Sequence, residues 1–216
     1  NSAAAVHYED SLVRVIRDFK PDFYKLDYNT NAKEGGQNPV HGWSESEHWR
    51  HQDAVHKAYD RVLREFPDVC LENCAGGGGR NDLGMLSRFH YFCESDVSAH
   101  PLAIRAINAM TMFIPPESVV YYHNHMAGAH LRADLDTHLR VTLFGVPVFV
   151  GFGAQGADRT TPYFQKTKRY IALHKGFCRP VLTGHPVVFH HTPDIGVFGP
   201  ADWCVLEYAM KDASRG

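Results

Sequence analysis

Short apolar runs typical of β-strands alternate with apolar residues at helical spacing along most of the chain. The strand-like runs lie at residues 23–27, 69–73, 91–95, 119–123 and 146–152. The helical patterns lie at residues 8–19, 44–66, 83–86, 101–114, 131–143 and 163–175. Ser44 and Glu47 have the spacing of a capping box, and Gly176 stands where a helix C-cap is expected. Because strands separated by helices pair in parallel, the pattern predicts an α/β fold.

Polar residues with useful chemistry stand at the ends of successive predicted strands. They are Asp27, Asn73, Asp96 and His123. A doubly wound sheet places its site at one switch point, whereas a (β/α)8 TIM barrel collects residues from many strand ends at one rim. The pattern therefore favours a barrel, and the chain holds only part of it, about strands 4 to 8.

The last part of the chain has a different pattern. Prolines become frequent after Gly176, and residues 203–209 alternate between apolar and polar side chains. We therefore expect two parts. Residues 1–178 would form the second half of a catalytic barrel, and residues 179–216 would start a C-terminal β-sandwich domain.

The composition is that of a soluble globular protein. Of its 216 residues, 44% are hydrophobic and 21% charged, which is enough apolar material for a sizeable core. A net charge of −2 argues against a nucleic-acid surface, and no run approaches the ~18 apolar residues of a membrane helix. The five cysteines lack the paired spacing of a metal site, so we expect reduced thiols, a cytoplasmic protein and no cofactor.

Residues 71–80 form the most informative segment, Leu-Glu-Asn-Cys-Ala-Gly-Gly-Gly-Gly-Arg. Consecutive glycines let a ligand approach the backbone closely, although a flexible linker has similar composition. The segment is not a phosphate loop, because Gly79 is followed by Arg80 rather than by Lys and Ser or Thr. A neutral, hydroxyl-rich ligand fits better.

Three segments together resemble the signature blocks of family 36 glycoside hydrolases, the microbial α-galactosidases and their relatives. They are residues 25–29 (Lys-Leu-Asp-Tyr-Asn), residues 74–86 with the glycine run, and Ser95-Asp96 followed by Arg105. The resemblance extends from about Phe19 to Lys211, and the glycine block is its most specific part. In that family a large β domain precedes the barrel and a smaller one follows it.

The resemblance implies a retaining mechanism with Asp27 as nucleophile and Asp96 as acid/base. Such a mechanism needs two carboxyl groups about 5 to 5.5 Å apart, so we expect these two to face each other across one cleft. Lys25 lies two residues before Asp27 on the same strand face, where its charge favours an ionised carboxylate. The alternatives are that Asp27 caps the following loop and that Asp96 is the N-cap of the helix near Pro101.

The predicted sugar contacts follow the same motifs. They are Lys25, Asn29, Cys74, Gly76, Gly77, Arg80 and His123. The resemblance places Cys74 and the glycines around the sugar 2-position, where an intact loop favours galactose over N-acetylgalactosamine. Cys74 is not expected to act as a nucleophile, since no base stands beside it in the sequence.

The chain also departs from the family pattern. Cys93 and Leu26 stand where the family commonly has tryptophan, and aromatic walls stack on sugar rings. The exact sugar and linkage therefore stay open. Trp43 is expected in a loop that faces the substrate, and Trp49 in the core of a helix.

Histidines offer a second interpretation. His123-Asn124-His125 has the His-x-His spacing of metal-dependent barrel hydrolases, although lining a sugar pocket is an equal possibility for His123. We assign no metal ligand. His190 and His191 are interpreted as an ordinary loop pair.

The function that these motifs favour is retaining hydrolysis of terminal α-linked galactose, or of related α-glycosides, through a covalent glycosyl-enzyme intermediate. Transglycosylation uses the same carboxylates and stays possible. The alternatives are a degenerate sugar-binding homologue and a metal-dependent hydrolase that uses His123. The partner expected is an oligosaccharide or α-galactoside, and the full-length enzyme is expected to be a homo-oligomer.

The 216 residues alone are expected to be inactive. A partial barrel leaves strand edges unpaired at residues 23–27 and 146–152, and such edges recruit other chains.

Overall fold

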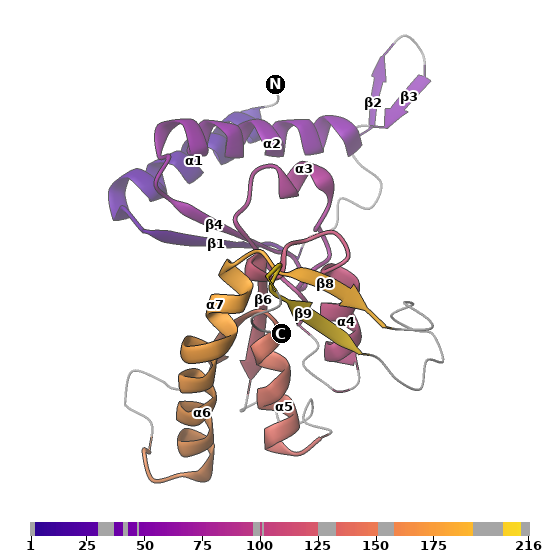
Figure 1. Ribbon diagram of the computed structural model, residues 1–216. Coiled ribbons are helices and arrows are strands. Elements are labelled where there is room, and N and C mark those ends of the chain that lie inside the picture. The colour runs from indigo at the N-terminus through magenta and orange to yellow at the C-terminus, as the bar shows by residue number, and fades with distance from the viewer. Residues whose placement is uncertain are drawn as a thin grey trace. The chain divides into compact units, whose positions relative to one another are not determined.

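The computed structural model describes residues 3–29, 37–40, 43–46, 48–96, 100, 102–124, 133–150, 158–191 and 205–212 (Figure 1). The chain divides into two compact units, Asn1–Tyr91 and Phe92–Gly216, and each is described by itself. Among the described residues, no helix has both the length and the apolar character that a membrane crossing requires.

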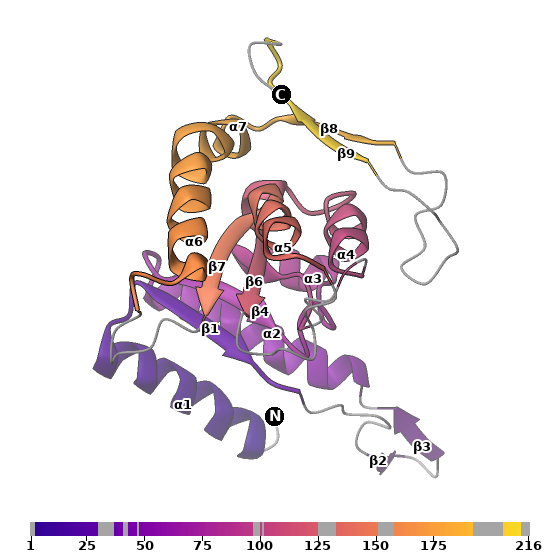
Figure 2. The same cartoon turned by 90° about the horizontal axis from the view of Figure 1, so that it is seen from below.

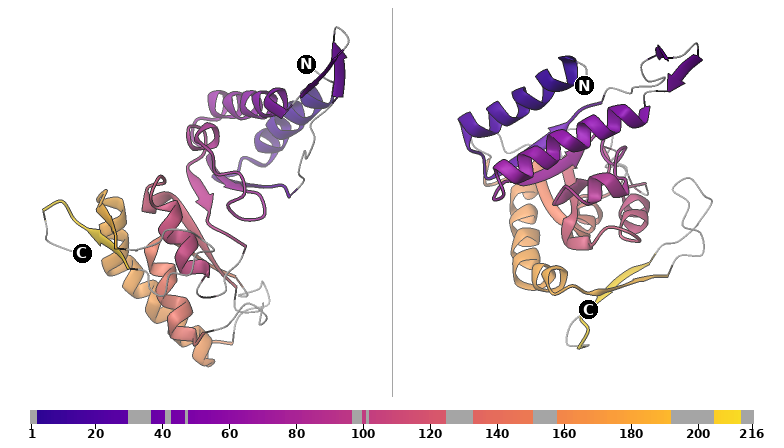
Figure 3. Two further views of the ribbon diagram at one scale, coloured as in Figure 1. Left: turned by 90° about the vertical axis from the view of Figure 1, so that its right-hand side faces the viewer. Right: turned by 90° about the horizontal axis from the view of Figure 1, so that it is seen from above.

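The first unit contains a parallel strand pair covered by two long helices. Its elements are α1 (Ala3–Phe19), β1 (Phe23–Asp27), β2 (Gln37–Val40), β3 (Trp43–Ser46), α2 (His48–Glu65), β4 (Cys70–Cys74) and α3 (Leu83–Leu86). Strand β1 pairs with β4 in parallel, and β2 pairs with β3 as an antiparallel hairpin. Helices α1 and α2 lie side by side over β1 and β4 (Figures 1 and 3), and they bury apolar side chains such as Ile16 and Val62.

The second unit repeats the alternation of strand and helix. Its elements are β5 (Tyr91–Cys93, beginning at the unit boundary), α4 (Leu102–Met110), β6 (Val119–Asn124), α5 (Leu135–Val141), β7 (Val146–Val150), α6 (Pro162–Leu173), α7 (Arg179–Thr183), β8 (Val187–His190) and β9 (Leu206–Ala209). Strands β5, β6 and β7 pair in parallel in that order, and β8 pairs with β9 in antiparallel fashion. Figure 2 shows α4, α5 and α6 beside β6 and β7.

The core of the second unit lies between β6 and its helices. Tyr121 of β6 packs with Ala103 and Ile107 of α4 and with Val141 of α5. A second cluster joins α7 to β9 through Val181, Leu182 and Tyr208. The Tyr208 hydroxyl donates a hydrogen bond to the Phe144 carbonyl oxygen at 2.8 Å, which anchors β9.

The predicted fold class is confirmed: these are the strands and helices of a partial (β/α)8 barrel followed by the first strands of a β region. All five predicted strands are present with nearly the predicted bounds. The division after residue 178 stays a prediction; α7, β8 and β9 follow that position.

Four local predictions were wrong. Ser44 lies in strand β3 and α2 begins only at His48, so Ser44 is not the N-cap of that helix. Gly176 lies within a π-helical segment, His174–Cys178, that continues from α6 into α7. His190 belongs to strand β8 rather than to a loop. Trp49 is 61% exposed and is not a core residue.

Candidate active site

Strands β1 and β4 present one polar face. Lys25 is the register partner of Glu72, and Asp27 is the register partner of Cys74. Because side chains alternate along a strand, these four share one face of the pair. The partners Leu26 and Asn73 lie on the opposite face. Asp27 is exposed at the carboxyl end of β1, while Cys74 is buried at the carboxyl end of β4.

Lys25 and Glu72 form an ion pair across the two strands. The Lys25 Nζ lies 3.3 Å from the Glu72 Oε1, with the lysine side chain 30% exposed and the glutamate side chain 1% exposed. The sequence analysis assigned Lys25 to Asp27 and missed Glu72. One signal was present, since Glu72 is the single charged residue of the strand Cys70–Cys74.

The glycine segment folds into a tight turn directly after β4. Gly76 and Gly77 have positive φ values of 55° and 76°, which residues with a Cβ rarely adopt. The Ala75 N–H donates to the Gly77 carbonyl at 2.8 Å, and the Gly79 N–H donates to the Ala75 carbonyl at 3.2 Å. A Cβ at Gly79 would lie 2.6 Å from the Ala75 carbonyl oxygen. The segment is therefore a defined turn and not a flexible linker.

Polar residues tie this turn to the end of β1. The Asn29 Oδ1 accepts a hydrogen bond from the Gly76 N–H. The Arg80 guanidinium lies over the Tyr28 ring, 3.9 Å from its centroid, and this cation–π contact holds Arg80 against the segment that follows β1. The Asn73 Nδ2 donates to the Arg80 carbonyl at 3.0 Å. The structure thus brings Asn29, Cys74, Gly76 and Gly77 together at the carboxyl ends of β1 and β4, while Arg80 lies against Tyr28 and Lys25 lies two residues before Asp27 on β1.

Asp96 follows β5 in the second unit and is exposed. Helix α4 begins only at Leu102, so Asp96 is too distant in the chain to be its N-cap. Asp27 belongs to the first unit and Asp96 to the second. Their facing across one cleft therefore stays a prediction.

Glu94, which the sequence analysis did not single out, is buried two residues before Asp96. Only 4% of the residue is exposed, and within the described part of the chain neither carboxyl oxygen has a hydrogen-bond partner. Burial, reinforced by the nearby charge of Asp96, raises the pKa of Glu94 to about 9. Glu94 is therefore protonated at neutral pH.

His123 lies in a buried aromatic group rather than at an open strand end. It is fully buried, and its ring centroid lies 6.0 Å from those of His138 and Phe149 and 5.8 Å from that of Tyr163. These neighbours include residues of α5 and α6, so the ring faces the helix layer. We do not retain His123 among the sugar contacts. His125, the other half of the His-x-His pattern, lies outside the described residues.

Two histidines of this buried group have lowered pKa values. The His100 and His138 rings meet with centroids 4.4 Å apart. Burial lowers the pKa of both, and the neighbouring His138 helps to bring the pKa of His100 to about 4. Among the described residues, no group with the spacing of three metal ligands includes His123.

Comparisons with known proteins identify the family of the chain. A sequence model of the melibiase family matches residues 2–184. The chain is 26% identical over 184 residues to α-galactosidase AgaA of Geobacillus stearothermophilus. The aligned region covers 81% of this chain and 24% of that protein. It is 30% identical over 132 residues to an α-galactosidase of Escherichia coli, covering 60% of this chain and 18% of the relative.

Solved structures show that the fold is shared with larger proteins. The crystal structure of AgaA, a family 36 α-galactosidase, superposes with a TM-score of 0.76 at 20% identity, covering 98% of this chain and 29% of the other. The α-galactosidase of Lactobacillus brevis gives a TM-score of 0.74 at 20% identity, covering 98% and 28%. The chain thus spans roughly a quarter of the length of AgaA, one of its curated relatives. Because the family match extends over most of the chain, the chain belongs to the melibiase family.

Proposed function

We propose that the protein containing this chain is a retaining α-galactosidase, with Asp27 as nucleophile and Asp96 as acid/base. One observation supports the proposal. In this chain, which belongs to the family, the exposed Asp27 lies on the same strand as the ion-paired Lys25 and in register with Cys74, which the tight glycine turn follows. A carboxylate, a cation and small backbone groups on one face suit a ligand with many hydroxyl groups.

The proposed chemistry has two steps. The Asp27 carboxylate attacks the anomeric carbon while Asp96 protonates the departing glycosidic oxygen, and a galactosyl ester on Asp27 results. Asp96 then takes a proton from water, and that water displaces Asp27 from the sugar with a second inversion. The galactose that is released keeps its α configuration.

The proposed substrates are α-galactosides of the oligosaccharide class. AgaA variants in which an aspartate is replaced by asparagine or alanine have been solved in complex with raffinose and stachyose, respectively. In this chain Gly76 and Gly77 leave the wall beside Cys74 without bulky side chains, which supports recognition of a small 2-hydroxyl group. A cytoplasmic location and a homo-oligomeric state belong to the same proposal.

The proposal is tested by kinetics of the full-length protein on 4-nitrophenyl α-galactoside, with and without a chelator. Replacing Asp27 by Ala should lower kcat by at least about 10⁴-fold on all substrates, because the nucleophile is lost. Replacing Asp96 by Ala should cost about 10²- to 10⁴-fold on natural oligosaccharides and much less on the nitrophenyl substrate, whose leaving group needs little protonation.

Azide distinguishes the two roles. It should rescue Asp27→Ala with a product of opposite anomeric configuration and Asp96→Ala with a product of the same configuration. Asp22, exposed just before the other end of β1, gives a matched control, and Asp22→Ala should keep its activity. Loss of wild-type activity on chelation, or equal losses in all three variants, would contradict the proposal.

A further inference from the structure

We propose that Glu72 is a positioning residue that fixes the ammonium group of Lys25 over the substrate face. This inference rests on the proposed function and adds a residue to it. Glu72 is buried on β4, while Lys25 comes from β1, so the pair links the two strands that carry Asp27 and the glycine turn.

The register brings the two charges together. Lys25 and Glu72 are direct partners in the parallel pair, and their side chains emerge from the same face. Their charged atoms lie 3.3 Å apart. The next partners along this face are Asp27 and Cys74, at the carboxyl ends of the strands. The ion pair therefore lies immediately behind the proposed nucleophile and the turn.

The two side chains of the ion pair differ in burial, with Glu72 on the protein side and Lys25 on the solvent side. Glu72 is 1% exposed, whereas the Lys25 side chain is 30% exposed. A buried carboxylate is stable only with a cation or several donors beside it, so Glu72 holds the lysine from the protein side. An ammonium group has three N–H donors, and fixing one of them toward Glu72 sets the directions of the others. The open side of Lys25 is the side that a substrate would reach.

The ion pair with Glu72 also keeps Lys25 from acting as the counterion of Asp27, so that the lysine can bind the sugar instead. A lone lysine beside Asp27 would be drawn onto that carboxylate and compete with its attack on the sugar. With Glu72 as a second anion on the face, the ammonium has a fixed counterion that takes no part in the reaction. Lys25 can then donate to a sugar hydroxyl while Asp27 stays available as nucleophile.

The test uses the full-length protein and the variants Glu72→Gln, Lys25→Met and the double variant. Binding of 1-deoxygalactonojirimycin, an iminosugar held in one AgaA structure, is measured by calorimetry alongside kcat and KM. We expect Glu72→Gln to weaken iminosugar binding and raise KM about ten- to hundredfold, with a smaller change in kcat. Because Glu72 acts through Lys25, the double variant should bind like Lys25→Met alone, within about twofold.

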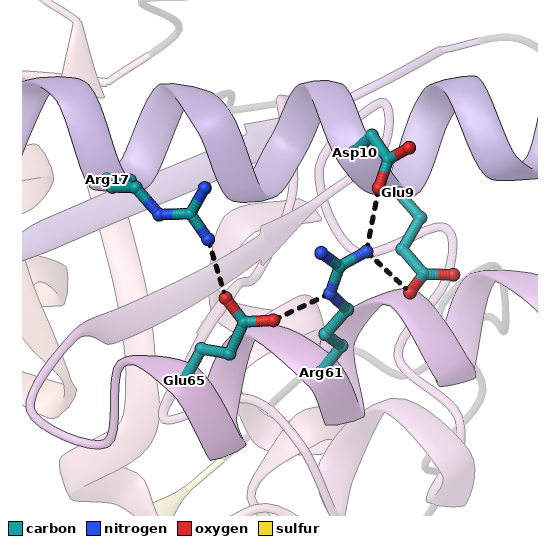
Figure 4. Close-up of polar contacts among 5 residues, drawn as sticks. All are labelled: Glu9, Asp10, Arg17, Arg61 and Glu65. Carbon is teal, nitrogen blue, oxygen red and sulfur yellow. Dashed lines mark hydrogen bonds and ion pairs between the residues drawn. The ribbon is translucent and has the colours of Figure 1, made fainter.

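Glu65→Gln provides the matched control. Glu65 is also an ion-paired glutamate of the first unit, bonded to Arg17 at 2.9 Å and Arg61 at 2.7 Å, but it lies on α2 in a surface network (Figure 4). Its loss should leave iminosugar binding unchanged. Unchanged binding per folded molecule in Glu72→Gln would show a purely structural role and overturn the inference, as would additive losses in the double variant.

Two further outcomes distinguish a failure of the inference about Glu72 from a failure of the proposed function. If Glu72→Gln does not fold, Lys25→Met is compared with the double variant, in which both charges are gone. Equal binding supports the inference, and a further loss overturns it. A wild-type protein that neither cleaves α-galactosides nor binds the iminosugar overturns the proposed function itself, whereas an active wild type with an unaffected Glu72→Gln overturns only the role of Glu72.

Discussion

Two glutamates, Glu72 and Glu94, are buried near the ends of parallel strands, yet they have opposite surroundings. Glu72 lies 3.3 Å from the ammonium of Lys25 on the face that carries Asp27. Glu94 has no hydrogen-bond partner within the described residues, and its pKa is raised to about 9 by burial and by the charge of Asp96. Burial of a glutamate alone therefore does not indicate that its carboxyl group is charged. A buried glutamate is expected to be charged when a cation lies beside it on the same face of the sheet, as Lys25 lies beside Glu72.

The surroundings of each glutamate extend this contrast. Beyond the carboxyl ends of β1 and β4, the strands of the Lys25–Glu72 pair, polar groups are tied together, as in the bond from the Gly76 N–H to Asn29 and the stacking of Arg80 on Tyr28. Burial, with a contribution from the charge of Glu94, raises the pKa of Tyr121, and the Tyr121 hydroxyl also lacks a hydrogen-bond partner among the described residues. The first region holds an ion pair on the strand face that carries Asp27, whereas the second holds a buried carboxyl group with no hydrogen-bond partner among the described residues.

The largest expected effect is on the pH dependence of stability. In the unfolded chain Glu94 ionises near its ordinary pKa of 4.5, whereas in the folded protein it keeps its proton up to about pH 9. Between these values the unfolded state binds fewer protons, so the free energy of unfolding falls as the pH rises, by up to about 1.4 kcal/mol per pH unit.

Replacing Glu94 by Gln should remove this slope, as measured by urea unfolding of the full-length protein between about pH 5 and 9. Glu65→Gln serves as the control, because the pKa of Glu65 is lowered by Arg61 and its titration lies below this range. Parallel curves for wild type and Glu94→Gln would show that Glu94 is ionised in the folded protein.

The second prediction compares the two glutamates at one pH. At neutral pH Glu72→Gln should lower the free energy of unfolding by about 2 kcal/mol, since it removes the Glu72 carboxylate from its ion pair with a partly buried ammonium. The partial exposure of Lys25 keeps this loss below that of a fully buried pair. Glu94→Gln should raise the free energy of unfolding, because an amide replaces a carboxyl group that resists ionisation. If both variants changed the free energy of unfolding in the same direction, the proposed difference between the surroundings of Glu72 and Glu94 would be wrong.

The glycine turn should be sensitive to single methyl groups. Gly79→Ala places a Cβ 2.6 Å from the Ala75 carbonyl oxygen and should cost about 1 to 3 kcal/mol of stability. Gly176→Ala is the matched control, because no atom lies within 4 Å of its added Cβ and its backbone is helical. That variant should gain up to about 1 kcal/mol. Equal melting temperatures for the two variants would show that the turn is not rigid.

The smallest effect is expected on the outer surface of the first unit. Arg61 bonds Glu9, Asp10 and Glu65, which connects α2 to α1 (Figure 4). Arg61→Ala should lower the melting temperature slightly, and the loss should shrink as salt is added, because exposed ion pairs are screened. Lys57→Ala, which removes a single pair with Asp53, should have less effect still. A loss that salt does not change would indicate packing rather than charge.

Much of the fold followed from local pattern. The five parallel strands were predictable because each is a short apolar run bounded by polar or turn residues. The hairpin of β2 and β3 was not, since residues 37–46 have no apolar alternation. The π-helical segment at Gly176 was missed because a glycine there looks like a C-cap, while burial of His174, Val181 and Leu182 accompanies the continued helix.

In the candidate site, too, features with a local sequence motif were predictable and features that depend on distant contacts were not. The glycine turn was predictable because adjacent residues identify it, and the role of Asp27, which rests on an equally local motif, stays a prediction. Glu72 was missed because its role depends on the register between two strands that are distant in the chain, and no local pattern contains that register. His123 was placed at a strand end correctly, but the direction of its ring depends on contacts with α5 and α6.

The most direct test of the account is to identify the residue that becomes attached to the sugar. The full-length protein is incubated with an α-galactosyl fluoride whose ring carries a second fluorine, which slows hydrolysis of the glycosyl-enzyme, and its peptides are analysed by mass spectrometry. The account predicts that the peptide containing Asp27 gains the mass of the sugar, and that the label is absent from Asp27→Ala. A label on the peptide containing Asp96, or steady turnover with no labelled peptide, would contradict it.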